Sequence, residues 1–270
     1  MDTRVTSAMT FQPPLVLDSN GGDAAKNFPI SLRIYSNTSD KTELYRLRYR
    51  AFRAAGWIGE NGPAALSDGY DLLPSTFAIA AFHNGRCIGS LRLAIGGAGA
   101  PGSMPCEEQF PAEIATLVAK GSKRLIEFSR MAVDPSLTNN SFRTTLYASL
   151  VRAGFILTHA AGVDVVLVAV HRKFSPFYQA MCGFKVIAKS DGYGDISEPT
   201  HFLGRELDEL DTRRRQRNAF FMFSPAEIER ARHTLHAAQH QAADGPDGGE
   251  GQRRHLERGR PAHQTPRLRL

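Results

Sequence analysis

The central part of the chain alternates between short apolar runs and longer amphipathic stretches, a pattern typical of a mixed α/β domain. The short runs predict strands at 30–35, 76–83, 86–95, 125–133, 164–170, 184–189 and 200–207. The amphipathic stretches predict helices at 40–56, 140–161, 173–182 and 225–240. Asn84-Gly85, between the second and third strands, is a strong signal for a tight hairpin turn. This order predicts an antiparallel hairpin that leads into a β-α-β unit.

Composition divides the chain into four parts. We expect a flexible N-terminal arm at 1–28, a folded domain at 29–208, a helical extension at 209–240 and a disordered basic tail at 241–270. The net charge is +6, but residues 211–270 carry 12 arginines against seven acidic residues. The basic excess therefore lies mainly outside the folded domain, and it does not predict specific nucleic-acid binding by that domain.

Several classes of protein are disfavoured by what the sequence lacks. No apolar run approaches the roughly 18 residues of a membrane-spanning helix, and the first residues form no apolar signal core. The three cysteines, Cys87, Cys106 and Cys182, are far apart and fit neither a disulfide framework nor a metal-binding pattern. We therefore expect a cytoplasmic protein with no transmembrane segment and no metal site.

The predicted helix at 40–56 carries an arginine on its apolar side. At 100° per residue, Arg48 falls about 40° from Leu44 and inside the arc that Leu47 and Phe52 define. A guanidinium group in that position keeps its charge, so it needs a carboxylate or a ligand. A structural ion pair and a long side chain that reaches solvent are equally compatible with the pattern.

Other charged residues lie where the pattern predicts partly apolar surroundings. Asp68 and Asp71 are three residues apart in a loop, and Arg92 interrupts an apolar strand. Glu127 and Arg130 are also three apart, within a strand, where a regular ladder would turn them to opposite faces. They share a cleft only if a bulge lies between them. Together these residues predict a polar site, although each one alone is as readily explained as a turn cap or a solvated charge.

This set of residues resembles the signature of two related families. Arg48, Phe52, Trp57, Asp68, Asp71, Arg92, Glu127 and Arg130 occur in the order found in acyl-homoserine-lactone synthases and in N-acyl amino acid synthases of the FeeM type. The resemblance covers about residues 30–207. It implies a three-layer α/β fold with a central mixed sheet, the fold of the GCN5-related N-acetyltransferases. It also implies an acyl group taken from acyl carrier protein.

Three further stretches are more similar to the amino acid synthases. These are the segments 47–52, 129–135 and 171–184, the last of which ends in Gly183-Phe184. The glycine-rich loop that holds the pyrophosphate of acetyl-CoA in the wider superfamily is missing. Residues 134–143, which stand at that place, contain no glycine. Fewer backbone amides then reach a pyrophosphate, which disfavours free acetyl-CoA and suits a phosphopantetheine arm held by a carrier protein.

The resemblance implies roles for these residues. Glu127 is the expected catalytic base, and backbone amides near 128–132 are expected to hold the thioester oxygen. The substrate-binding candidates are Arg48, Arg92 and Arg130 for a carboxylate and Asp68 and Asp71 for an ammonium group, with a purely structural role open for each. The candidates for the acyl pocket or thiol exit are Phe52, Trp57, His171 and Tyr178.

The predicted reaction is the transfer of a long-chain acyl group to the amino group of an amino acid or similar small amine, with no tightly bound cofactor. Two alternatives remain: an acyl-homoserine-lactone synthase that uses S-adenosylmethionine, and a non-catalytic protein that binds a lipid or a partner. Contact with a membrane is expected only through the lipid product. Docking of the acidic carrier protein is expected on basic residues, drawn from Lys120, Lys123, Arg124, Arg143, Arg172 and Lys173.

Overall fold

The structure is a computed structural model, and it describes residues 8–9, 30–37, 39–122, 124–194, 196, 198–207 and 223–243. Its strands are β1 (Ala8–Met9), β2 (Ser31–Tyr35), β3 (Thr76–His83), β4 (Arg86–Gly97), β5 (Arg124–Val133), β6 (Val165–His171), β7 (Lys185–Ser190) and β8 (Thr200–Glu206). Its helices are α1 (Thr42–Ala54), α2 (Cys106–Gln109), α3 (Pro111–Ala119), α4 (Asn140–Ala160), α5 (Ser175–Cys182) and α7 (Pro225–Ala243), with short 3₁₀ turns η1 (Gly69–Leu72) and η2 (Arg172–Phe174).

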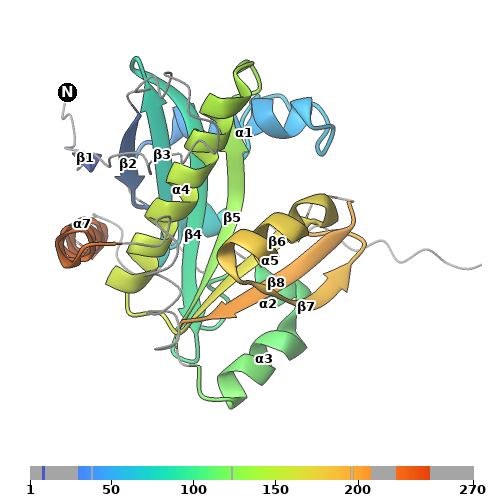
Figure 1. The fold of residues 1–270 in the computed structure, drawn as a ribbon, viewed down its shortest axis with the longest axis vertical. Helices are drawn as coiled ribbons and strands as arrows, with labels where there is room; N and C mark the ends of the chain where they lie inside the picture. Colours follow the sequence, from blue (N-terminus) through green and yellow to red (C-terminus); the bar gives the residue numbers. More distant parts are fainter. Residues whose placement is uncertain are drawn as a thin grey trace, which may run out of the picture.

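The described strands form one mixed sheet in the order β1-β2-β3-β4-β5-β6-β8-β7 (Figure 1). Only β5 and β6 pair in parallel, and α4 connects them as the crossover helix of the predicted β-α-β unit. The predicted hairpin joins β3 to β4, with Asn84 at φ +49° and Gly85 at φ +76°. Positive φ at both central turn residues is the geometry that Asn-Gly favours.

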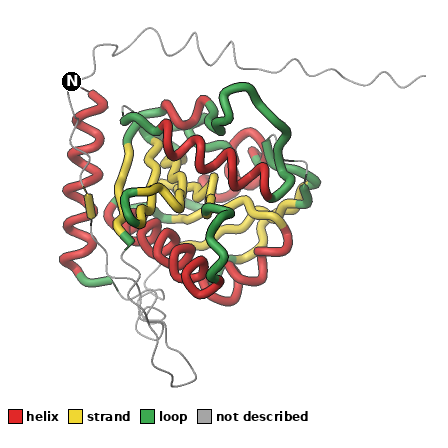
Figure 2. The backbone as a smooth tube through the Cα atoms, turned by 90° about the horizontal axis from the view of Figure 1, so that it is seen from above, coloured by secondary structure: helices red, strands yellow, loops and turns green. Residues whose placement is uncertain are grey.

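Helices cover both faces of this sheet, which confirms the expected three layers (Figure 2). Along β3, Phe77 and Ile79 pack into the cluster that contains α4, whereas Ala78 and Ala80 pack against Leu44 and Leu47 of α1. The α4 face also carries α5 and α7, and α3 lies on the α1 face. Because strand residues alternate between faces, each position on β4 and β5 can be assigned to one of the two layers.

Two parts of the fold differ from the sequence-based expectation. Residues 106–119, for which no element is predicted, form α2 and α3, where Pro111 begins α3 and Ile114 packs into the core. Within the expected flexible arm, Ala8–Met9 pairs with β2. The expected disordered tail from residue 244 onward lies outside the described residues, and 241–243 belong to α7.

The sheet opens between its two parallel strands. Pairing between β5 and β6 ends at Phe128 and Val168, although the strands continue to Val133 and His171. Figure 1 shows β5 continuing upward while β6 and β8 turn aside. Beyond Phe128 and Val168 the two strands are no longer paired, and we call this unpaired stretch the gap. Among the helices that the structure describes, none is long and apolar enough to cross a bilayer.

Candidate active site

A network of ion pairs lies on the α1 face of the sheet and joins α1, η1, β4 and β5. Arg48 donates to Asp71 at 2.8 Å, and Arg92 donates to Asp68 at 2.5 Å. Arg130 donates to the second oxygen of Asp68, also at 2.8 Å. We call these five residues the ion network. Of the two interpretations that the pattern leaves open for Arg48, the structural ion pair is confirmed, since Arg48 is buried and bonded to Asp71.

A bulge in β5 brings Arg130 into this network. Ser90 pairs with Ala132 but Arg92 pairs with Ser129, so two residues of β5 lie opposite one residue of β4. Arg130, inside the bulge, has φ +51°. Its side chain therefore lies on the same face as that of Glu127, and the predicted break in alternation is confirmed.

The turn η1 places the two aspartates. Asp68 is its N-cap and accepts from the backbone N–H of Tyr70 at 3.0 Å, while Asp71 accepts from the backbone N–H of Asp68 at 3.1 Å. These local bonds hold both carboxylates in place: Asp68 accepts from an arginine at each oxygen, and Asp71 accepts from Arg48 at one. The interpretation as a turn cap and the interpretation as an ion-pair partner are therefore both correct for the same residues.

Burial divides the network into an inner and an outer part. Arg48, Asp71 and Arg92 are at most 1% exposed, whereas Arg130 is 12% and Asp68 23% exposed. Burial alone would raise the pKa of Asp68, but Arg92 and Arg130 outweigh it and hold that pKa well below its usual range. Asp68 is thus a carboxylate at any physiological pH.

Glu127 lies beside the network, at the base of the gap between β5 and β6. It is fully buried, and its carboxyl group accepts from the backbone N–H of Cys106 at 2.8 Å and from the Tyr193 hydroxyl at 2.6 Å. Burial raises the pKa of Glu127, and these donors together with Arg92 only partly oppose that effect. A carboxyl group with a raised pKa is suited to proton transfer near neutral pH.

Aromatic side chains line the outer end of the network. The Phe52 and Trp57 rings meet edge to face with centroids 5.3 Å apart, and Trp57 stacks on His171 at 6.3 Å. The Arg130 guanidinium lies 5.9 Å from the Phe52 ring centroid. The structure thus brings three of the four predicted pocket residues together.

Tyr178 lies elsewhere. It belongs to the core on the α4 face, and its hydroxyl is 2.5 Å from that of Tyr147. The structure therefore does not bring Tyr178 to the ion network.

Two partners of Glu127 escaped sequence reasoning. The donor from Cys106 is a backbone group at the start of α2, and Tyr193 lies 66 residues away in the chain. The proline at the start of α3, followed by Ile114, Leu117 and Val118 at helical spacing, was the one available signal for this helical segment. No group of three or more metal-binding side chains gathers within the described part of the chain.

The sequence and the site match one described protein family. A family model for the N-acyl amino acid synthase FeeM matches residues 43–206, which is more than half of the chain. This chain belongs to the FeeM family of N-acyl amino acid synthases. The match runs from α1 to the end of β8 and so includes every member of the ion network and Glu127. The enzyme is accordingly an N-acyltransferase.

Three solved structures are similar to this chain. FeeM itself, an N-acyl amino acid synthase from uncultured soil microbes, is 22% identical, with a TM-score of 0.54 over 72% of this chain and 98% of that chain. The acyl-homoserine-lactone synthase LasI is 19% identical, with a TM-score of 0.49 over 66% of this chain and 90% of that chain. An acyl-CoA N-acyltransferase from Pseudomonas aeruginosa is 13% identical, with a TM-score of 0.43 over 65% of this chain and 99% of that chain. Among curated proteins, none matches the sequence.

The FeeM structure confirms the predicted mixed α/β fold with a central sheet for this FeeM-family chain. In that frame the gap between β5 and β6, the bulge at Arg130 and the buried Glu127 occupy one continuous region of the sheet.

Proposed function

We propose that this FeeM-family enzyme transfers a long-chain acyl group from acyl carrier protein to the amino group of an amino acid. The observation that carries the proposal is the juxtaposition of the strand gap, the bulge with Arg130, and Glu127 at the base of the gap. In the reaction, the amine nitrogen attacks the thioester carbonyl, a C–N bond forms and the C–S bond breaks. The proton lost by the amine passes to Glu127 and from there to the leaving thiolate.

The outer part of the ion network supports an amino acid as acceptor. Arg130 presents a guanidinium group that is 12% exposed, and it lies beside the aromatic group of Phe52 and Trp57. Such a group binds a carboxylate in a fixed geometry. Asp68 stands next to it and offers an anion for the ammonium form of the same molecule. Arg48, Asp71 and Arg92 are sealed from solvent, so we assign them the role of holding this outer pair in place.

The N-terminus of α4 supports a carrier-bound donor rather than free acyl-CoA. The Asn139 side chain accepts from the backbone N–H of Phe142 at 2.9 Å, and the Asp134 side chain accepts from the N–H of Ser136 at 3.0 Å. Backbone amides that would contact a pyrophosphate are thus occupied by the chain's own side chains.

The basic residues expected to dock the carrier do not form one surface. Lys120 and Arg124 lie near the amino end of β5, whereas Arg172 and Lys173 follow the carboxyl end of β6, where the gap opens. Lys123 lies outside the described residues. We therefore assign docking to the basic residues beside the gap. Phe174, 40% exposed, adds apolar surface there.

The decisive measurement supplies the purified enzyme with acyl carrier protein or CoA thioesters, a mixture of amino acids, and S-adenosylmethionine in a parallel reaction. We expect an N-acyl amino acid with a free carboxylate, formed from the carrier-bound donor and detected by mass spectrometry. A lactone product that requires S-adenosylmethionine would identify a homoserine-lactone synthase instead. Absence of any acyl transfer would contradict the proposal as a whole.

Two charge-reversal variants test where the acyl carrier protein docks. Lys173→Glu should raise KM for the acyl carrier protein several-fold, because acidic carriers are attracted by positive charge. The effect should weaken at high salt. Lys120→Glu, an exposed change at the far end of the sheet, should leave that KM unchanged. Equal effects of the two variants would show that docking beside the gap is wrong.

A tyrosine variant tests the protonation of Glu127. In Tyr193→Phe the carboxylate loses a hydrogen bond that favours its charged form, so the pKa of Glu127 should rise further. Because the base acts unprotonated, the acid limb of the kcat–pH profile should shift to higher pH. Tyr70→Phe is the control, since that hydroxyl donates to the exposed Glu108 instead. An unshifted profile in Tyr193→Phe would argue that Glu127 is not the titrating base.

A further inference from the structure

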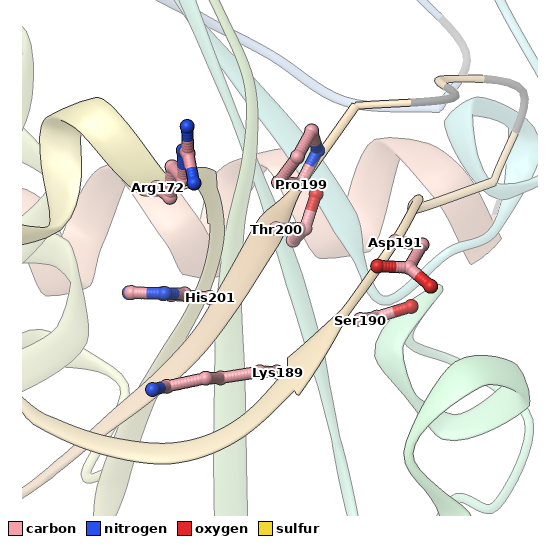
Figure 3. A pocket seen from close by; sticks show the side chains of 7 residues that line it. All are labelled: Arg172, Lys189, Ser190, Asp191, Pro199, Thr200 and His201. Atoms are coloured by element: carbon pink, nitrogen blue, oxygen red, sulfur yellow. The ribbon is translucent and has the colours of Figure 1, made fainter.

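A shallow pocket of about 340 Å³ lies where β6 ends, between that point and the paired strands β7 and β8. Its basic lining residues are Arg172, Lys189 and His201. Figure 3 shows their side chains in one row on the same side of the strands, while Asp191 and Ser190 lie on the other side of the pocket. None of these residues belongs to the ion network or to the pair formed by Glu127 and Tyr193.

Sheet register explains why the row exists. His201 of β8 stands directly opposite Lys189 of β7, and Arg172 follows His171, the partner of Thr200. The backbone N–H of Arg172 donates to the Pro199 carbonyl at 2.8 Å, which holds the third cation beside the other two. The end of β7, the start of β8 and the turn after β6 thus bring Lys189, His201 and Arg172 side by side.

Arg172 and Lys189 are exposed, so water stabilises their charges, and a bound anion would lower the repulsion that remains between them. Basic side chains that stand directly opposite each other on paired strands repel. Burial, Lys189 and Arg172 all lower the pKa of His201, which records this repulsion. The structure gives neither Arg172 nor Lys189 an ion pair with any described carboxylate, and the buried Nδ1 of His201 has no hydrogen-bond partner. The pocket therefore offers several donors to one incoming anion.

The pocket lies at the end of β6, whose other side borders the gap. His201 lies on the same face as its partner Val170, which packs with the α4 cluster, whereas Glu127 lies on the opposite face. Leu167 is the β6 partner of Glu127. Val170 is three residues further along, which places the pocket about 10 Å from the level of Glu127 along the strand. A flexible donor arm that passed through the gap would reach from the pocket to Glu127.

Resting on the proposed function, we infer that this pocket binds the phosphate of the donor's 4′-phosphopantetheine arm. Arg172, Lys189 and the single imidazole N–H of neutral His201 would surround the phosphate oxygens, and the arm would carry its acyl thioester through the gap to the bulge. The closed N-terminus of α4 fits this assignment, because the phosphate then needs another cationic site. Guanidinium and ammonium groups bind phosphate by charge-assisted hydrogen bonds.

Two small donors that differ only in this phosphate test the inference. The donors are S-acyl-pantetheine and its 4′-phosphate. Each is measured with three enzymes: the wild type, the double variant that combines Lys189→Gln with His201→Gln, and the single variant Lys185→Gln. Lys185 is the matched control because it is exposed on the same strand but faces Gly204, away from the pocket. In the wild type and in Lys185→Gln, KM should be about 10-fold lower for the phosphorylated donor. In the double variant the ratio of the two KM values should fall to about one.

The His201 ring signals in NMR give a readout that does not need turnover. They should move when 4′-phosphopantetheine is added to the wild type and stay in place with pantetheine. A phosphate advantage that survives in the double variant, or none in the wild type, would overturn the inference. If no donor yields product but the His201 signals respond to the phosphate, the proposed function fails and the pocket assignment stands. Acyl carrier protein and acyl-CoA are then measured with the same variants, and the donor whose KM rises in the double variant is the one that occupies the pocket. A KM that is unchanged for both donors would also overturn the inference.

Discussion

Replacing Glu127 with glutamine is expected to lower kcat by about 10²–10⁴-fold, the range that a positioned general base contributes. The substitution keeps the shape of the side chain, and its amide can still accept from the Cys106 N–H and donate to the Tyr193 hydroxyl oxygen. What it removes is the group that takes the proton from the attacking amine. The measurement is single-turnover acyl transfer at saturating acceptor and donor.

The pH dependence separates this role from a structural one. Because burial raises the pKa of Glu127, wild-type activity should fall on acidification at a pH above the ordinary range of a glutamate. The residual activity of the Glu127→Gln variant should not show this fall on acidification. Glu206→Gln, an exposed change at the end of β8, serves as the control. A folded Glu127→Gln enzyme with near wild-type kcat would place the base elsewhere.

Most of the sheet could be predicted because its signals are local. The β-branched run of β6 and the Asn84-Gly85 turn each specify their structure within a few residues. The helices α2 and α3 were missed because they follow a glycine-rich stretch, and α2 has only four residues. A helix that short owes its conformation to tertiary contacts, here to the bond between the Cys106 N–H and Glu127.

The candidate site was predictable where charge conflicts with an apolar pattern. Arg48 on the apolar side of a helix and Arg92 within an apolar strand signal pairing, because neither burial is favourable without a partner. The spacing of Glu127 and Arg130 signals the bulge in the same way. Tyr193 gives no such signal, because a tyrosine in a loop conflicts with nothing. Nor does sequence show that Tyr178 packs on the face opposite Glu127, since that follows from how α5 docks.

Replacing Arg48 with alanine is expected to destabilise the protein by about 3–5 kcal/mol, the usual cost of removing one partner from a buried ion pair. Asp71 is 1% exposed, and without Arg48 it keeps only Arg92, at 3.4 Å, as an ion-pair partner within the described residues. The loss of the large buried side chain adds a cavity between α1 and the sheet. Two nitrogens of Arg48, Nε and Nη2, are buried without acceptors, so the wild-type pair is already imperfectly satisfied, which favours the lower end of this range.

The measurement is chemical or thermal unfolding, in which this loss corresponds to a melting temperature lower by about 10 °C for a domain of this size. Arg46→Ala is the matched control, because Arg46 lies two residues earlier on the exposed side of α1. Its free energy of unfolding should change by no more than about 0.5 kcal/mol. Because Arg48 has no solvent contact, its loss should act on kcat mainly through the position of Asp68 and Arg130. An Arg48→Ala variant that is as stable as the wild type would mean that Arg92 alone neutralises Asp71, and the assigned structural role of Arg48 would be wrong.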